Sequence, residues 1–238
     1  NLLIDCGLSA KALERALSEA GSSIKEIDAI LLTHEHSDHT KGVGVLSRKY
    51  AFPIYATAKT HSSITKVGEI DDELKINISS GEDFEIGAIR ISPFSIHHDA
   101  ADPVGYSFHI GADKYTIATD TGYISRGLLE KLKGSKAILL ESNHDIAMLK
   151  SGPYPPHLKL RILSDSGHIS NNVCSDEIKH LLKSGTTRFI LGHLSKENNT
   201  PLLALSCAEA ALMDLGAKNG RDCIVSVAAP KNNGVTII

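Results

Sequence analysis

Apolar and polar residues alternate along the chain in two patterns, short continuous apolar runs and apolar positions spaced three or four residues apart. Residues 27–33 and 53–56 are runs typical of buried strands, whereas residues 11–20 have helical spacing and stop at Gly21. A further helix is predicted within residues 40–50. The beginning of the chain therefore predicts strands and helices in alternation.

The middle of the chain follows a different pattern, because residues 74–119 form strand after strand separated by turn signals such as the predicted hairpin at Gly111-Ala112-Asp113. Beyond it, helices are predicted at 124–133, 175–184 and 201–215, and strands at 136–140, 187–191 and 223–228. No strand is followed by a G-x-G-x-x-G turn, which argues against a doubly wound nucleotide-binding fold. We expect one α/β domain with two sheets and outer helices.

The composition excludes several classes of protein. With 238 residues, of which 42% are hydrophobic, the chain can bury a large core, so disordered and fibrous classes are excluded. The formal net charge of -3 provides no overall positive field, so a nucleic acid would have to be bound by a local patch. No apolar run reaches the roughly 20 residues of a membrane span and no signal peptide is visible, so no membrane partner is expected.

The cysteine pattern indicates a reducing environment. The four cysteines are far apart and include no C-x-x-C pair. This pattern is typical of reduced thiols in a cytoplasmic protein, and it argues against a disulfide framework or a cysteine-based zinc site. The sequence begins at Asn1 on the apolar run Leu2-Leu3-Ile4, from which we expect that an upstream segment is missing.

The densest chemistry in the sequence is the segment THEHSDHT, which directly follows the predicted strand at 27–33. Imidazole and carboxylate groups are ligands of borderline divalent metals, and an H-x-H step places two imidazoles on one side of the backbone. His34 and His36 can therefore share one ion, while Asp38 and His39 face another. The alternative is a histidine-rich surface loop, which the position after a buried strand disfavours.

Two ions need further ligands, and three candidates end apolar runs. His98 lies on the inner face of a predicted strand at 94–98, so its neighbour His97 points outward. Asp120 ends a second run, where the alternative is an N-cap of the following helix. His193 ends a third run, and its alternative is a core histidine without a metal. Together they predict a centre of two divalent ions, with zinc, manganese and iron all open.

The order H-x-H-x-D-H, His, Asp, His resembles the metallo-β-lactamase superfamily over nearly the whole chain. The resemblance implies a four-layered αββα sandwich, in which two mixed sheets are flanked by helices, and a single catalytic domain over residues 1–238. It implies one ion on His34, His36 and His98, the other on Asp38, His39 and His193, and Asp120 as the bridge. Asp5 matches the early structural aspartate of the superfamily.

More narrowly, the segments HHDAADPVGYSF, TDTG, LLESNHD, SGHISN and LGHLSKENN resemble the bacterial YycJ/WalJ branch, whose members are associated with nuclease activity on DNA. That branch usually carries a Ser/Gly-rich strand and loop upstream of LLIDCG, and the sequence lacks it. The resemblance therefore leaves part of one sheet edge and one wall of the site undefined.

Residues outside the ligand set should choose the substrate, because the superfamily hydrolyses lactams, lactones, thioesters and phosphodiesters. The loop at 164–171 carries hydroxyls, an imidazole and a glycine that suit phosphate binding, and the residues expected to bind the substrate there are Ser166, His168, Ser170 and Asn171. The alternative is an ordinary loop before a helix capped by Ser175. His144 could also face the substrate, although a turn that caps the next helix explains its segment almost as well.

The sequence thus favours a dinuclear metal-dependent phosphodiesterase, a nuclease of the 5'-3' exonuclease type that acts on DNA. Asp38 is expected to orient the attacking water and accept its proton, and His168 to stabilise charge on the phosphoryl group. Two alternatives stay open, a hydrolase of a small ester, lactone or thioester, and a non-enzymatic zinc module. The general acid and the oligomeric state are not predicted.

Overall fold

The computed structural model describes residues 1–228, and these fall into two compact units. The N-terminal unit comprises Asn1–Glu82 and Ala100–Val104, and the C-terminal unit comprises Asp83–Asp99 and the described chain from Gly105 onward. Each unit is built around its own β-sheet. No helix within residues 1–228 is long and apolar enough to cross a membrane.

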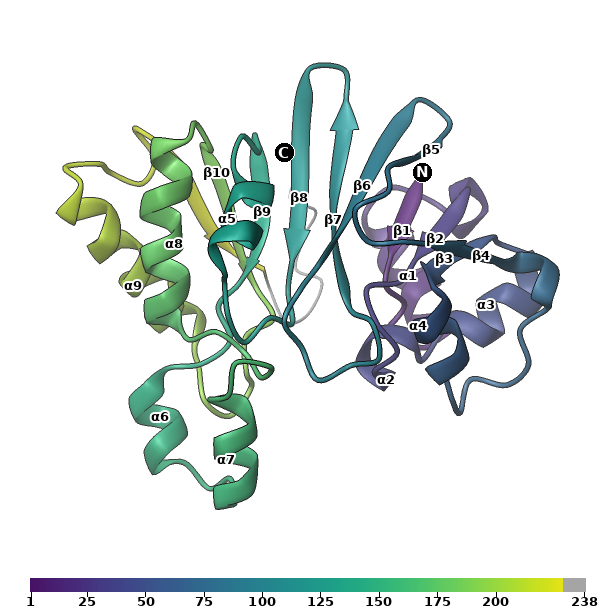
Figure 1. Ribbon diagram of the computed structural model, residues 1–238, viewed down its shortest axis with the longest axis horizontal. Coiled ribbons are helices and arrows are strands. Elements are labelled where there is room, and N and C mark those ends of the chain that lie inside the picture. The colour runs from purple at the N-terminus through teal and green to yellow at the C-terminus, as the bar shows by residue number, and fades with distance from the viewer. Residues whose placement is uncertain (229–238) are drawn as a thin grey trace. The chain divides into compact units, whose positions relative to one another are not determined.

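The sheet of the N-terminal unit has four strands in the order β1-β2-β3-β4 (Figure 1). The strands are β1 Leu2–Ile4, β2 Ala29–Leu31, β3 Ile54–Thr57 and β4 Lys75–Ile78. All three pairs are parallel, so each connection crosses over and carries helical segments. The helices are α1 Ala10–Glu19, α2 Ser37–Thr40, α3 Val43–Tyr50 and α4 Ala58–Ser63, with 3-10 turns at Ile24–Glu26 and Asp72–Leu74.

The core of the N-terminal unit fixes the strand that precedes the histidine motif. Ile30 and Leu31 of β2 are fully buried, and apolar side chains of α1 and α3 such as Leu13 and Leu46 are buried in the same unit. Full burial of one such aliphatic side chain stabilises the fold by about 1.5–3 kcal/mol. The carboxyl end of β2 is therefore a firm base for the segment that follows it.

The sheet of the C-terminal unit has seven strands in the order β11-β10-β9-β8-β7-β6-β5. The strands are β5 Phe84–Ile86, β6 Ile89–Ser95, β7 Val104–Ile110, β8 Asp113–Ala118, β9 Ala137–Glu141, β10 Arg188–Gly192 and β11 Ile224–Val227. The pairs from β8 to β11 are parallel, whereas β5–β6 and the hairpin β7–β8 are antiparallel. This sheet is therefore mixed.

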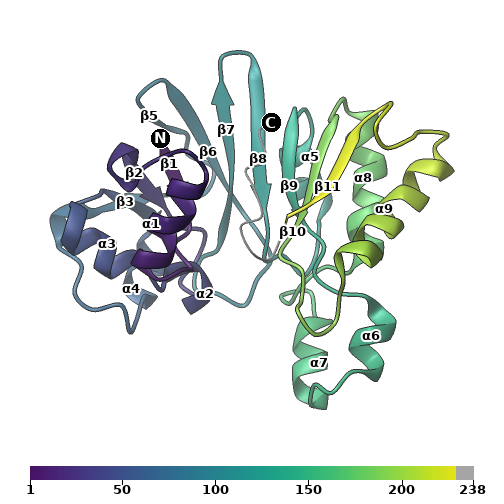
Figure 2. The ribbon, with the colours of Figure 1, turned by 180° about the vertical axis from the view of Figure 1, so that it is seen from behind.

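Helices cover the parallel part of the larger sheet, where α8 and α9 lie side by side on one face (Figure 2). The helices of this unit are α5 Arg126–Leu132, α6 Ile146–Ser151, α7 Pro156–Ile162, α8 Asn171–Lys183 and α9 Pro201–Asp214. Ile178 of α8 and Leu212 of α9 are fully buried in one cluster with Phe189 and Leu191 of β10. This packing holds the carboxyl ends of β9 and β10, from which site residues project.

The predicted α/β class with two sheets and outer helices is confirmed, and the structure corrects several details. Within residues 1–228 the smaller sheet contains only parallel pairs, so the prediction that both sheets are mixed is wrong for these described strands. The helix predicted at 175–184 begins at Asn171 and is capped by Ser170, whose hydroxyl accepts a hydrogen bond from the Val173 N–H. Ser175 is buried inside this helix and does not cap it.

Candidate metal centre

Asp5 follows β1 and organises the histidine motif that follows the neighbouring strand β2. Its Oδ1 accepts a hydrogen bond from the Thr33 backbone N–H at 2.8 Å, and its Oδ2 accepts one from the Thr33 hydroxyl at 2.8 Å. The same Oδ2 lies 2.7 Å from Nδ1 of His39. A carboxylate on the Nδ1 side fixes an imidazole ring and leaves Nε2 for a metal. Asp5 therefore has the structural role that the sequence indicates.

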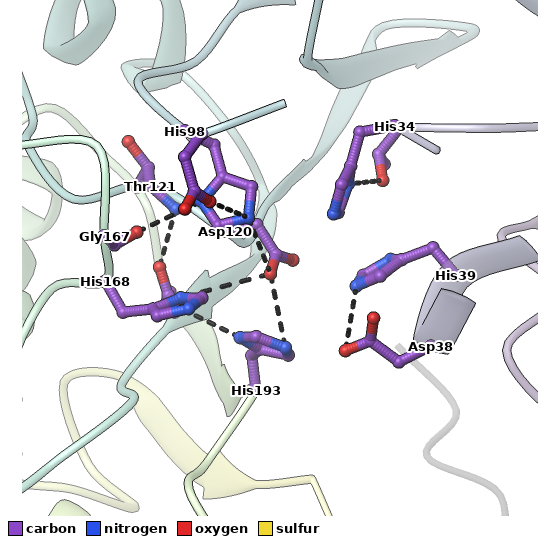
Figure 3. A network of polar contacts seen from close by, with 12 residues as sticks. His34, Asp38, His39, His98, Asp120, Thr121, Gly167, His168 and His193 are labelled. Atoms are coloured by element: carbon purple, nitrogen blue, oxygen red, sulfur yellow. Dashed lines mark hydrogen bonds and ion pairs between the residues drawn. The ribbon is translucent and has the colours of Figure 1, made fainter. Parts of the chain in front are cut away.

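Four side chains of the motif gather within the N-terminal unit. The ring centroid of His34 is 4.6 Å from that of His36 and 4.1 Å from that of His39. Nε2 of His39 lies 3.8 Å from a carboxylate oxygen of Asp38 (Figure 3). His34 and His39 are buried, whereas the Asp38 side chain is exposed. The loop presents three imidazoles and one carboxylate together, which is a ligand set for divalent cations.

The chain after β1 packs directly on this motif, and glycine is required there. A Cβ atom on Gly7 would lie 1.6 Å from the backbone oxygen of Asp38, which no side chain could tolerate without a shift of the backbone. The adjacent Cys6 donates its backbone N–H to the oxygen of His39 at 2.6 Å. The position of the motif is thus tied to β1 as well as to β2.

In the C-terminal unit, three adjacent parallel strands bring ionisable side chains together at their carboxyl ends. Asp120 follows β8, Glu141 ends β9 and His193 follows β10. Because the carboxyl ends of parallel strands meet at one edge of a sheet, these residues are neighbours although they are far apart in the sequence. His98 comes from the segment after β6, and His168 from the loop before α8.

Asp120 lies in the middle of this cluster (Figure 3). Its Oδ1 is 3.3 Å from Nε2 of His193 and 3.8 Å from Nε2 of His98. Nδ1 of His168 is 4.0 Å from the same oxygen. Only 2% of Asp120 is exposed, so a negative charge on its carboxylate needs stabilisation by the surrounding imidazoles, by hydrogen-bond donors or by cations. This position suits a carboxylate that contacts metal ions.

Glu141 is a member of the cluster that the sequence analysis did not assign to the site. It is fully buried, and its Oε1 lies 2.8 Å from Nδ1 of both His168 and His193. Its Oε2 accepts a hydrogen bond from the Thr121 backbone N–H at 2.7 Å. Burial by itself would raise the pKa of this carboxyl, but the hydrogen bonds to the two imidazoles and their charges together outweigh it and lower the pKa to about 2. Glu141 is therefore an anion that orients both rings.

Two of these strand-end residues have an unusual backbone conformation. The φ angles of Asp120 and His193 are 59° and 55°, and that of Asp5 in the other unit is 59°. Residues other than glycine rarely adopt positive φ, and such residues cluster at functional sites, where the surrounding structure holds them in place. The conformation therefore supports a functional role for these positions independently of their side-chain chemistry.

His98 is held in its neutral form. Burial lowers the pKa of His98, and the nearby Asp120 carboxylate only partly offsets this effect. Nδ1 of His98 lies 3.2 Å from the carbonyl oxygen of Gly167, an arrangement that favours the tautomer in which Nδ1 donates. A neutral imidazole whose Nδ1 carries the proton has its lone pair on Nε2, which is the form that binds a metal.

The donor set fits borderline divalent ions. Five imidazoles share one feature, an Nδ1 atom next to a protein oxygen, and they are His34, His39, His98, His168 and His193. Within the C-terminal unit, one ligand atom each of Asp120, Glu141, His168 and His193 lie within 4.8 Å of one another. Imidazole nitrogens whose other nitrogen is fixed, together with carboxylate oxygens, match the ligands of zinc, manganese and iron.

The structure decides the alternatives for several neighbouring positions. Asp120 does not cap α5, because the hydroxyl of Ser125 accepts the capping hydrogen bond there. The turn after β9 does cap the next helix, since Asp145 Oδ1 accepts from the Met148 N–H at 2.8 Å. His97 is exposed while His98 is buried, as the strand alternation predicts, although β6 itself ends at Ser95.

The residues predicted to bind phosphate differ in exposure. His168 contacts Glu141, and Ser166 is exposed on the same loop. Three others are buried in protein contacts: Ser170 caps α8, Asn171 accepts a hydrogen bond from the Ser142 hydroxyl at 2.7 Å, and His144 accepts one through its backbone oxygen. Burial lowers the pKa of His144 to about 4, so this imidazole is neutral at neutral pH. Substrate binding by these residues stays a prediction.

A family model described as "Beta-lactamase superfamily domain" matches residues 1–194, and the chain belongs to this superfamily. Among known proteins, the chain is 41% identical to "Exodeoxyribonuclease YycJ" of Bacillus anthracis over 216 residues, which cover 90% of the chain and 82% of that protein. It is also 41% identical to "Exodeoxyribonuclease WalJ" of Streptococcus pneumoniae over 206 residues, 85% of the chain and 77% of the relative. These matches confirm the resemblance to the YycJ/WalJ branch.

Solved structures confirm the fold. The Zn(2+)-bound PqqB from Methylobacterium extorquens matches with a TM-score of 0.66 and 19% identity, over 95% of the chain and 80% of PqqB. The metallo-beta-lactamase fold protein YhfI from Bacillus subtilis matches with a TM-score of 0.65 and 17% identity, over 97% of the chain and 85% of YhfI. At these identities the likeness shows the metallo-β-lactamase fold alone, as the sequence predicted.

Proposed function

We propose that this protein is a metal-dependent exodeoxyribonuclease. The observation that carries the proposal is the 41% identity to an exodeoxyribonuclease over 90% of the chain. The family model, which matches residues 1–194, covers the histidine motif and the strand-end residues Asp120, Glu141 and His193. Hydrolysis of a phosphodiester in DNA is therefore the reaction that we assign to the site, as the sequence analysis also favoured.

The proposal includes two divalent ions per chain. His34, His36 and His98 would hold one ion, Asp38, His39 and His193 the other, and Asp120 would bridge them. The support within each unit is the chemistry of its donors, namely imidazoles fixed at Nδ1 and the buried Asp120 carboxylate. When bound, such ions lower the pKa of water and polarise phosphoryl oxygens. Zinc, manganese and iron all suit this donor set.

The residues of the chain supply orientation and proton transfer. Asp38, whose side chain is exposed next to His39, is placed to orient the attacking water and to accept its proton. Glu141 binds Nδ1 of His168 and so directs Nε2 of that ring away from the carboxylate. With protons on both ring nitrogens, a form that the Glu141 anion stabilises, His168 would donate a hydrogen bond from Nε2 to the phosphoryl group as negative charge develops on it. Ser166, exposed on the same loop, extends this contact surface.

Several finer features belong to the same proposal. We assign a 5'-3' direction of degradation, a bacterial source and a cytoplasmic location, in line with the bacterial relatives and with four cysteines that form no disulfide. The buried Ser170, Asn171 and His144 would then shape the loop that carries His168 rather than touch the DNA first. The protein would act as a single catalytic domain, and the DNA backbone would follow a local basic strip.

The experiment that tests this function is an assay on end-labelled DNA with zinc, manganese or iron. We expect mononucleotide release that stops when a chelator removes the ions and resumes when they are restored. A parallel screen of small esters, lactones and thioesters tests the main alternative. Turnover of one of these compounds by an enzyme that leaves the DNA undegraded would overturn the proposal. A single chelation-resistant ion without any turnover would instead favour a structural zinc module.

Neighbouring histidines provide a matched test of the ligand set. His98→Ala is expected to lower the metal content and to reduce nuclease activity by about a hundredfold or more, because a ligand is lost. His97→Ala should leave the metal content unchanged and reduce activity less than about threefold, since His97 is exposed and its ring lies 5.6 Å from Tyr123. Elemental analysis and initial rates measure both. The reverse order of effects would remove His98 from the ligand set.

A further inference from the structure

We propose that a cavity beside His193 binds the terminal nucleotide of the DNA strand, with the base inside and a phosphate at the rim. The inference rests on the proposed exonuclease function and names the part of the substrate that is held next to the reacting bond. The cavity has a volume of about 390 Å³ and lies within the C-terminal unit. Its lining includes His193, Leu194, Ser195, Lys196, Asn199, Pro201 and Ala228.

The walls suit a flat and mostly apolar group. Leu194 follows β10, Pro201 opens α9 and Ala228 follows β11, so three separate elements contribute apolar surface. The imidazole of His193 adds a flat ring on which a base can stack. Contacts of this kind bind any of the four bases, since every base has a π-face. An exonuclease that removes successive nucleotides needs such tolerance.

The cavity is preformed by a buried amide. Asn199 is 5% exposed, and its Nδ2 donates to the backbone oxygens of Ser142 and Asn143 at 2.8 and 3.0 Å. Its Oδ1 accepts from the Thr200 N–H at 2.8 Å and from Nδ2 of Asn171 at 3.0 Å. These bonds join the loop after β10 to the loop after β9 and to the first residue of α8. Less ordering is then needed when a ligand enters, which favours binding.

Polar groups stand where a nucleotide would need them. The Ser195 hydroxyl oxygen accepts hydrogen bonds from the backbone and side chain of Asn198 at 3.2 and 3.4 Å, which leaves its own hydrogen for a base or sugar. Lys196 is exposed, and no carboxylate among residues 1–228 forms an ion pair with its ammonium group. A free cation next to an apolar cavity matches the phosphate of a nucleotide whose base is inserted.

The location connects this cavity to the reaction. His193 is part of its wall, and the Nε2 atom of the same ring lies 3.3 Å from Asp120. A nucleotide in the cavity would therefore have its phosphate on the side of the acidic and imidazole cluster of this unit. Binding of the end nucleotide at this point would explain exonuclease action, because only a strand with a free end can insert its last base.

The test measures binding of deoxyadenosine monophosphate to the metal-loaded chain by calorimetry. Ala228→Phe should fill the cavity and raise the Kd about tenfold or more, in line with the loss of one stacked base. The same variant should change the Kd of deoxyribose phosphate, which lacks a base, less than about twofold. Lys196→Ala should weaken the monophosphate about threefold or more and leave deoxyadenosine, which lacks the phosphate, unchanged.

Two variants in the same unit serve as controls. Ile224→Phe adds the same ring at an exposed position of β11. Lys183→Ala removes an exposed charge at the end of α8. Neither variant should alter the Kd of the monophosphate, of deoxyadenosine or of deoxyribose phosphate. An unchanged monophosphate Kd in Ala228→Phe, or an equal loss for deoxyribose phosphate, would overturn the subsite. Exonuclease activity of the wild type is measured separately, so that the two proposals can fail independently. If the wild type degrades DNA but Ala228→Phe binds the monophosphate with an unchanged Kd, the proposed function stands and only the subsite is contradicted.

Discussion

Asp120→Asn is expected to lose at least one of the two proposed ions and to reduce nuclease activity by about a thousandfold or more. The substitution keeps the size of the side chain and removes its charge from a position that is 2% exposed and 3.3 Å from Nε2 of His193. The imidazoles and Asp38 would then have to hold both ions without a shared anion. The fold should persist, because asparagine tolerates the φ of 59° found there.

Elemental analysis, initial rates and thermal unfolding of the same preparation test this prediction. Asp176→Asn is the matched control, because Asp176 is exposed on α8 and forms an ion pair with Lys179 on the same helix. We expect this control to keep its metal content and its rate. Two ions per chain and wild-type turnover in Asp120→Asn would contradict a bridging role, whereas a lost unfolding transition would point to a structural role for the carboxylate.

The sequence located best those candidate site residues whose position depends on one strand alone. Asp120 and His193 stand directly after apolar runs, and the alternation of inward and outward side chains along a strand distinguished the buried His98 from the exposed His97. The end of a strand can also be recognised from the local sequence, so the histidine motif could be placed directly after the predicted strand at 27–33, which contains β2. These predictions needed only the periodicity of one segment and the chemistry of its last residue.

Glu141 was missed because its role depends on the order of strands within the sheet. The residue ends β9, and it reaches both His168 and His193 only because β9 lies between β8 and β10. Periodicity along the chain carries no information on which strands are neighbours. A carboxylate at the end of a fully apolar run was the available signal, since a buried charge requires partners.

Strand direction and helix starts explain the remaining errors. Parallel and antiparallel strands have the same apolar period, so the sequence could not show that the described strands β1 to β4 all pair in parallel. The start of α8 was placed too late because Ser170 and Ser175 are both good N-cap residues. The structure selects Ser170, whose hydroxyl reaches the Val173 N–H, and the helix gains an extra turn that carries Asn171 into the core.

His168→Ala is the second change with a large expected effect. Removal of the ring should leave both ions bound, because Glu141 would still hold His193 through its 2.8 Å contact and Thr121 through its backbone N–H. The nuclease rate should fall by roughly 30- to 1,000-fold, or about 2–4 kcal/mol, which is the usual effect of removing one donor to a developing negative charge. His180→Ala on the exposed surface of α8 should change nothing.

The informative quantity is the ratio of two activities in His168→Ala at matched metal content. A phosphodiester develops charge on oxygens that His168 would contact, whereas a small activated ester can place its charge at a metal without this imidazole. The nuclease rate should therefore fall at least about tenfold further than any esterase rate measured on the same preparation. An equal loss of both activities would mean that His168 positions the site in general. A loss of metal would place His168 among the ligands, next to Asp120 and His193, where its 2.8 Å contact with Glu141 would fix the ring for coordination.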